Sequence, residues 1–197
     1  MAWYNASWSK RVKLTIDGAD GSTQTDFPVL ITGDNLPAGF WSNVKSDGTD
    51  IVCTADDGTT KLKREVVSIT TGSSYLEMYV KIPSHTTSTK DIYVYYGNSG
   101  ASETNDTDTW DSNYLAVYHM NDDPNSGGTQ QDSTSNNKDG TSAGSMTSGD
   151  LVAGAWGAGS TAWDFDGTDD YMEMDAHVAH FEGYDTGTFE CWAKQDS

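Results

Sequence analysis

Alternation of apolar and polar residues is the feature of this sequence that most restricts its fold. In residues 76–82 every second side chain is apolar, and in residues 92–96 Ile92, Val94 and Tyr96 alternate with Tyr93 and Tyr95. Successive side chains of a strand point to opposite faces, so both runs predict strands. They are the clearest strand pair in the sequence. Because no stretch shows sustained helical periodicity, we predict an all-β fold class.

Composition permits a packed core. Only 35% of the 197 residues are hydrophobic, but seven Trp, ten Tyr and five Phe are among them. Each aromatic side chain carries a large apolar area, which argues against wholesale disorder. No run approaches the roughly 20 apolar residues that a membrane-spanning helix needs, so we expect no membrane insertion.

Negative charge is concentrated in the second half of the chain. Residues 1–98 hold nine Lys/Arg and eleven Asp/Glu, whereas residues 99–197 hold two Lys/Arg and nineteen Asp/Glu. Phosphate binding needs a basic face, so nucleic acid is not an expected partner. The acidic excess has two interpretations, which are solubility in a salty habitat and the binding of divalent cations.

The strand pattern divides the chain into two β domains. Several short alternating runs in residues 1–98 predict a small antiparallel β-sandwich. Residues 99–112 consist mainly of acidic and small polar residues and have no apolar stripe, so we interpret them as a linker. Residues 113–197 are predicted to form the second domain, with strands at residues 114–119 and 188–194.

Residues 121–150 are very rich in Asn, Asp, Ser, Thr and Gly and contain almost no apolar residue. Disorder is one interpretation of such a composition. The other is a long ordered loop that is fastened by a metal ion or by hydrogen bonds. The sequence leaves both interpretations open.

The two cysteines, Cys53 and Cys191, lie in different halves, each within an apolar predicted strand. We predict two buried free thiols and no disulfide framework. The first residues, MAWYNASWSKR, lack the apolar core of a secretory signal. We therefore expect either a protein that acts without ordinary secretion or one whose signal has been removed.

The stretch WDFDGTDDYMEM, residues 163–174, is predicted to form a hairpin. Trp163 and Phe165 share one face by alternation, Asp166-Gly167 is a turn signal, and Tyr171 begins the second strand. Four aspartates crowd this hairpin and repel one another: Asp164, Asp166, Asp169 and Asp170. Either a bound cation or full exposure to water must offset that repulsion.

The first domain resembles an uncharacterised β-domain family found in bacterial, archaeal and phage proteins. The matching pieces are Trp8-Ser-Lys-Arg, Asp26-Phe-Pro-Val-Leu-Ile, Asp47-Gly-Thr-Asp-Ile, the Leu76–Pro83 strand and Ile92-Tyr-Val-Tyr-Tyr-Gly-Asn98. They span nearly all of residues 3–98. That family has no settled activity, so this resemblance implies a fold rather than a function.

The second domain resembles laminin-G-like, concanavalin A-type jelly rolls. The matching pieces are Ala116-Val-Tyr-His-Met, residues 132–141, residues 163–171 and Thr188-Phe-Glu-Cys-Trp192. The resemblance implies a two-sheet sandwich that binds glycan or protein, commonly with one structural Ca²⁺. Calcium takes six to eight oxygen ligands. The candidate ligands from the loops that such a fold brings together are Asp132, Asn136, Asp139, Asp169 and Asp170.

A jelly roll of this type usually exceeds 150 residues, whereas this one stops about 85 residues after Trp110. We therefore expect two antiparallel β-sandwich, jelly-roll-like domains with the second incomplete. Either the chain is a fragment of a longer protein, or another chain completes its sheets. A lone half-sandwich would expose an unpaired apolar edge.

The sequence does not favour catalysis. Glycanases need a pair of carboxylates, usually from an E-x-D-x-x-E run that is absent here, and Glu173 and Glu190 are isolated. His177 and His180 lack a third ligand nearby, so a zinc site is not expected. We predict that the protein is not an enzyme, and a glycanase fragment is the least favoured interpretation.

A structural or adhesive role remains. Exposed aromatic side chains in loops can stack on sugars, although for each of them singly ordinary loop packing is the favoured explanation. The candidate ligand-binding residues are Trp110, Trp156 and Tyr184. We expect a virion surface component, such as a tail fibre, head fibre or decoration protein, that binds glycan or protein and assembles as a homo-oligomer or with other subunits. A secreted or cell-surface carbohydrate-binding adhesin is the alternative.

Overall fold

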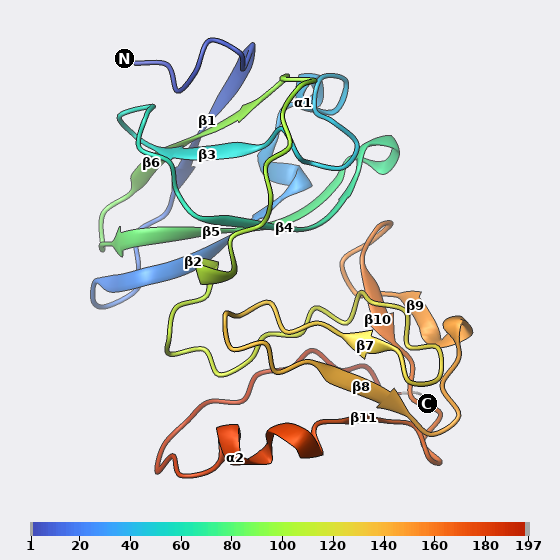
Figure 1. Cartoon of the computed structure of the whole chain (residues 1–197). Helices are drawn as coiled ribbons and strands as arrows, with labels where there is room; N and C mark the ends of the chain where they lie inside the picture. The colour runs from blue at the N-terminus through green and yellow to red at the C-terminus, as the bar shows by residue number, and fades with distance from the viewer. Residues whose placement is uncertain (1, 196–197) are drawn as a thin grey trace.

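The computed structural model describes residues 2–195 and shows an all-β protein built in two parts (Figure 1). The N-terminal part is a sandwich of two three-stranded antiparallel sheets. The C-terminal part, residues 113–195 and here named the second unit, lies beneath the sandwich in Figure 1 and contains smaller sheets. The all-β fold class predicted from the sequence is confirmed.

Both sheets of the sandwich mix strands that are distant in sequence. The strand order is β1-β6-β3 in one sheet and β2-β5-β4 in the other. The strands are β1 (Lys10–Ile16), β2 (Gln24–Thr32), β3 (Val52–Ala55), β4 (Arg64–Thr70), β5 (Tyr75–His85) and β6 (Lys90–Tyr96). The connections contain the short helix α1 (Ala38–Trp41) and the 3-10 turns η1 (Gly33–Asn35) and η2 (Thr71–Ser73).

The core lies between the two sheets. Met78 and Val80 from β5 and Val94 from β6 are fully buried in it. The alternation read from the sequence sets which side chains of β5 point inward. The predicted pairing of β5 with β6 is wrong, because β5 lies between β2 and β4 while β6 lies between β1 and β3. The chain crosses from one sheet to the other, so these strands belong to opposite layers.

The outer face of β6 is also covered. Tyr95 is fully buried there beside Trp8, and this explains why both faces of β6 are apolar. The Arg11 guanidinium lies 4.7 Å from the ring centroid of Trp3 and 4.4 Å from that of Tyr93. Its Nη1 donates 2.8 Å hydrogen bonds to the Tyr95 hydroxyl and to a backbone carbonyl of the N-terminal segment.

Residues 99–112, the connecting segment, pack on the sandwich along most of their length. Asn105 accepts a hydrogen bond from the backbone N–H of Val66 and donates one to its carbonyl, both at 2.9 Å, as a neighbouring strand would. Ala101 and Trp110 are buried. The segment also contains a 3-10 turn, η3 (Thr107–Thr109).

The second unit has little regular structure. Its three-stranded sheet has the order β11-β8-β7, and its two-stranded sheet pairs β10 with β9. The strands are β7 (Thr129–Gln130), β8 (Gly140–Ala143), β9 (Leu151–Ala153), β10 (Thr161–Trp163) and β11 (Tyr171–Glu173). The helical elements are α2 (Val178–Phe181) and the 3-10 turns η4 (Ser148–Asp150) and η5 (Asp175–His177).

The predicted hairpin at residues 163–174 is wrong. β10 and β11 flank the Asp166-Gly167 turn, but β10 pairs with β9 and β11 pairs with β8. The turn itself is present, and Gly167 has a φ of 72°. The two sides of the stretch therefore separate into different sheets, because each finds its ladder partner earlier in the chain.

Two other predicted strands of the second unit do not form. Residues 114–119 are irregular, because the backbone N–H of Val117 bonds to the Asp132 carboxylate instead of a neighbouring strand. Residues 188–194 have no strand partner within the described residues. Cys191 is consequently exposed, which contradicts the prediction of two buried thiols. Cys53 is buried as predicted, and burial raises the pKa of its thiol to about 12.

Across residues 2–195, no helix is long and apolar enough to cross a membrane.

Candidate functional site

The candidate site lies where the second unit meets the outer face of the β2-β5-β4 sheet (Figure 1). The alternation that buries Met78 and Val80 turns Glu77 and Tyr79 of β5 toward the second unit. Glu65 of the adjacent strand β4 faces the same side. Two carboxylates therefore lie in the contact between the two parts of the molecule.

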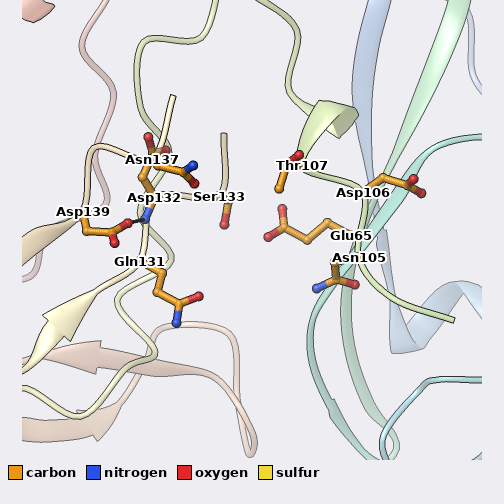
Figure 2. Close-up of a pocket in the computed structure, with 9 residues that line it drawn as sticks. All are labelled: Glu65, Asn105, Asp106, Thr107, Gln131, Asp132, Ser133, Asn137 and Asp139. Carbon is orange, nitrogen blue, oxygen red and sulfur yellow. Dashed lines mark hydrogen bonds between the residues drawn. The ribbon is translucent and has the colours of Figure 1, made fainter. Parts of the chain in front are cut away.

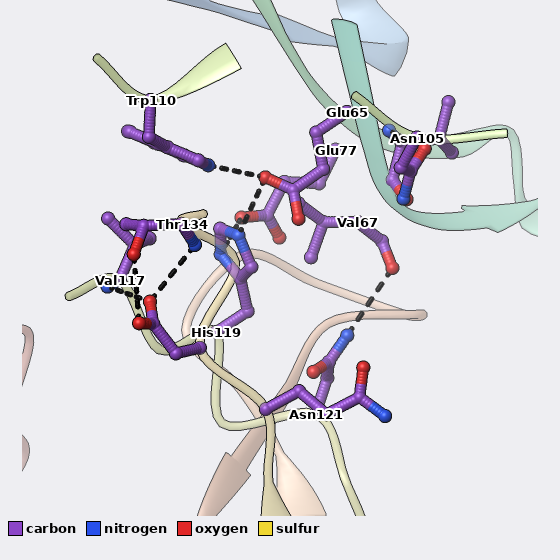
Figure 3. A network of polar contacts seen from close by, with 12 residues as sticks. Glu65, Val67, Glu77, Asn105, Trp110, Val117, His119, Asn121 and Thr134 are labelled. Carbon is purple, nitrogen blue, oxygen red and sulfur yellow. Dashed lines mark hydrogen bonds and ion pairs between the residues drawn. The ribbon is translucent and has the colours of Figure 1, made fainter. Parts of the chain in front are cut away.

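A histidine and a tryptophan engage these carboxylates, as Figure 3 shows. The indole Nε1 of Trp110 donates a 2.6 Å hydrogen bond to Glu65 Oε2. His119 Nε2 lies 3.2 Å from the same oxygen, and His119 Nδ1 lies 4.0 Å from Glu77 Oε1. The side chains of His119 and Glu65 are only 9% and 10% exposed, so this is a buried polar network.

The contacts within this network shift the pKa values of Glu65 and Tyr79. Burial alone would raise the pKa of Glu65, but hydrogen bonds from His119, Ser133 and Trp110 and the histidine charge lower it overall. Tyr79 stacks on His119 with ring centroids 5.6 Å apart. Burial and the neighbouring carboxylates raise the pKa of Tyr79 to about 12, so its hydroxyl stays protonated at neutral pH.

A polar cavity of about 220 Å³ lies beside the network, between the sandwich and the loops of the second unit (Figure 2). Oxygen-bearing side chains dominate its wall. Those that line it are Glu65, Asn105, Asp106, Thr107, Gln131, Asp132, Ser133, Asn137 and Asp139. Such a wall suits a hydroxylated ligand or water more than an apolar ligand.

Asp132 organises the loops on the far side of this cavity. Its Oδ1 accepts from the backbone N–H groups of Val117 and Thr134, both at 3.0 Å. Its Oδ2 accepts from the Thr134 hydroxyl at 2.8 Å and from the Lys138 N–H at 2.9 Å. Four donors thus occupy a carboxylate that is only 5% exposed. Within residues 121–150, the loop is ordered by hydrogen bonds.

The remaining predicted metal ligands near Asp132 serve the same loops. The Asn136 amide donates to the carbonyls of Tyr114 and Leu115, both at 3.1 Å. Asp139 accepts the backbone N–H of Asp132 at 2.9 Å. The Asn136 amide nitrogen thus fastens residues 114 and 115 to the loop before β8, and one carboxylate oxygen of Asp139 accepts a protein donor.

Asp169 and Asp170 lie at the other end of β8. The strand begins directly after Asp139, and the residues that follow it bond to the two aspartates: Ser145 N–H donates to Asp170 at 3.1 Å and its hydroxyl to Asp169. At about 3.3 Å per residue, the strand separates the two groups by well over 10 Å. The five predicted ligands therefore fall into two groups.

A different trio of carboxylates does converge. One oxygen of each of Asp166, Asp169 and Asp170 lies within 4.8 Å of the others. The Asp166 N–H donates to Asp170 Oδ2 at 3.2 Å, which closes the turn. Hydrogen bonds from the backbone of Thr168 and Asp169 lower the pKa of Asp166. This donor set is hard and oxygen-rich, as calcium requires, although three carboxylates alone do not complete its coordination.

The three predicted ligand-binding aromatics differ in exposure. Trp110 is only 7% exposed and its indole donates to Glu65, so it is unavailable for stacking on a ligand. Trp156 is 56% exposed and Tyr184 is 58% exposed. Trp156 contacts Trp192 edge to face, with ring centroids 4.9 Å apart. Trp192, which was predicted to lie in a strand, is therefore a further exposed aromatic side chain, in contact with Trp156.

Sequence reasoning missed the network of Glu65, Glu77, Tyr79 and His119. One signal was available: Glu77 and Tyr79 occupy the polar positions of the most regular strand, and Tyr is a large side chain to leave exposed. The partner residues come from about 40 to 55 positions later in the chain. No local pattern pairs residues so far apart.

The network lies inside a region with a recognised sequence family. Residues 47–135 match DUF2341, a domain of unknown function. No curated protein and no solved structure matches the chain. The predicted resemblance of residues 3–98 to an uncharacterised β-domain family is confirmed in part, because the match leaves out residues 3–46 and extends beyond residue 98. The DUF2341 match starts at Asp47 and continues through the connecting segment to include Trp110, His119 and Asp132.

Proposed function

We propose that the protein is a non-catalytic structural and adhesive module that binds a glycan or a protein surface. The observation that carries this proposal is the exposed aromatic group of the second unit. Trp156, Tyr184 and Trp192 are each more than half exposed in irregular segments. Aromatic rings in such positions stack on sugar faces and anchor protein interfaces.

The hydrogen bonds of the two carboxylates Glu65 and Asp132, which line the cavity, support a non-catalytic role. Glu65 is held by Trp110 and His119, and Asp132 is held by four donors. A general acid or base needs a carboxyl that can reach its substrate with a suitable pKa. The lowered pKa of Glu65 favours a permanently ionised structural carboxylate.

We propose that the module belongs to a virion surface as part of a tail fibre, head fibre or decoration protein, and a secreted or cell-surface adhesin is the alternative. A strongly acidic surface keeps densely displayed subunits soluble, which supports either setting. Mass spectrometry of purified particles and of envelope fractions separates the two. Detection only in the envelope fraction would overturn the virion assignment.

Calcium is part of this proposal as a structural ion, and we assign it to Asp166, Asp169 and Asp170. The closeness of their oxygens supports the assignment. A bound ion stabilises the folded state, so 1 mM calcium should raise the thermal midpoint relative to excess chelator. Asp169→Asn should abolish that difference, whereas Asp164→Asn, which removes an exposed carboxylate outside the trio, should retain it. An equal midpoint with calcium and with chelator would remove calcium from the proposal.

The adhesive role is tested by binding to a glycan array and to a panel of surface proteins. Trp156→Ala and Tyr184→Ala should each weaken the strongest signal about tenfold or more, as expected for anchor residues. Tyr171→Ala is the matched control, because Tyr171 is also about half exposed (53%) but lies on β11, in the sheet of β11, β8 and β7. Equal losses in all three variants, or no binding by the unmodified protein, would contradict the proposal.

A further inference from the structure

The C-terminal segment of the second unit is exposed and unpaired. Every residue from 182 to 195 is exposed, and Phe189 and Trp192 are 89% and 75% exposed. Residues 183–195 form no hydrogen bond within the described part of the chain. A run of free backbone donors and acceptors beside large apolar side chains is a template for pairing with another strand.

The sequence of this segment suits a strand. Residues 188–194 alternate, with Phe189, Cys191 and Ala193 on one face and Glu190, Trp192 and Lys194 on the other. Phenylalanine and tryptophan favour strands. No strand pairs with the segment within the described residues.

We propose that this segment pairs antiparallel with the same segment of a second copy of the chain, in a register centred on Trp192. In that register Glu190 of each copy lies opposite Lys194 of the other. No other antiparallel self-pairing places these two charges directly opposite each other, and registers centred on Glu190 or Lys194 oppose like charges. The contact is isologous, as closed dimers require.

Charge supports a second copy as the occupant. Lys194 is one of only two Lys/Arg in residues 99–197, against nineteen Asp/Glu. Over most of the second unit, two copies would repel each other. Neither Glu190 nor Lys194 has an ion-pair partner among the described residues, and the Glu190 charge also raises the pKa values of Tyr79 and Tyr114. Two copies that associate through this segment therefore meet less charge repulsion than two copies that associate through the rest of the second unit.

The first test is charge reversal on the full chain, with mass measured by sedimentation across a concentration series. The unmodified protein should dimerise, and Glu190→Lys or Lys194→Glu should each raise the dimer dissociation constant about tenfold, since two cross-strand pairs become repulsive. The double variant E190K/K194E restores both pairs, so its dimer dissociation constant should lie within about threefold of that of the unmodified protein. The exposed segment contributes little to folding, so the thermal midpoint should not change. A monomer at every concentration, or a double variant no better than either single one, would overturn the proposal.

The second test fixes the register by oxidative cross-linking. With Trp192 at the centre, Cys191 lies opposite Ala193 of the second copy, while the two Cys191 residues are diagonal neighbours about 7–8 Å apart. That distance exceeds what a disulfide spans without backbone movement. Ala193→Cys should therefore form a disulfide-linked dimer on mild oxidation, whereas the unmodified protein should not; Cys53 is buried and does not interfere. Efficient cross-linking of the unmodified protein would refute this register. Both tests read mass, so they succeed or fail independently of the adhesive role.

Discussion

Single side chains hold the irregular loops of the second unit, and Asp132 is the clearest case. Both of its carboxylate oxygens accept two hydrogen bonds. Asp132→Asn replaces one acceptor oxygen by an NH₂ group that faces two donors, so we expect a loss of about 3 kcal/mol in the free energy of unfolding. Asp139→Asn is the matched control, because one acceptor oxygen suffices for its single bond from Asp132. Urea denaturation measures both, and equal losses would contradict this role for Asp132.

Glu65 gives the molecule a defined pH dependence. Its pKa is lowered from the ordinary value of 4.5, so the stability it contributes is present above pH 4.5 and is lost as pH falls through the folded-state pKa. His119→Gln removes the main group that opposes burial, so the pKa of Glu65 in the variant should rise. The difference in unfolding free energy between the two proteins should therefore be largest above pH 4.5 and shrink in acid. Chemical denaturation from pH 3 to pH 7 checks this, and a difference independent of pH would contradict it.

Strand β1 fastens the N-terminal segment, residues 2–9, to the sandwich through the side chain of Arg11. Its guanidinium lies over two aromatic rings and donates to the Tyr95 hydroxyl and to the Ala2 carbonyl. We expect Arg11→Ala to lower the free energy of unfolding by about 2 kcal/mol and to speed proteolysis within residues 2–9. Lys13→Ala is the matched control, because Lys13 is two positions along the same face and forms only an exposed pair with Asp91. Unfolding and limited proteolysis together test this, and equal proteolysis rates would refute it.

The elements also show what sequence alone could and could not predict. β5 was predictable because alternation reports the buried face of a strand directly, and β6 was predictable from its short run of β-branched and aromatic residues. Their partners were not, since neighbouring runs can pair or can cross to the opposite sheet with the same alternation. Residues 114–119 alternate as well, yet the Asp132 carboxylate takes a hydrogen bond that a strand would need. Pairing depends on contacts distant in sequence, and therefore so does the network around Glu65.

At the scale of the whole molecule, the two parts meet through buried polar contacts as well as aromatic packing. Trp110 lies between them, with its ring centroid 4.8 Å from that of Tyr79 and 5.0 Å from that of Tyr114. The sequence indicated a linker at residues 99–112 because the segment is polar and lacks an apolar stripe. Its hydrogen bonds to Arg64 and Val66 show how a polar segment can still be part of a packed unit.

This arrangement predicts where the chain can be divided. A protein of residues 1–112 keeps Ala101 buried, Asn105 beside β4, and the hydrogen bond from Trp110 to Glu65. A protein of residues 1–98 loses all three, including the hydrogen bond that Trp110 donates to Glu65. We expect the free energy of unfolding of the longer piece to exceed that of the shorter one by about 3 kcal/mol. This corresponds to a thermal midpoint that is roughly 15 °C higher. Urea and thermal denaturation of the two pieces, beside the full chain, measure this. Equal stabilities would mean that residues 99–112 act as a linker, and the contacts of Asn105 and Trp110 would then contribute nothing to the sandwich.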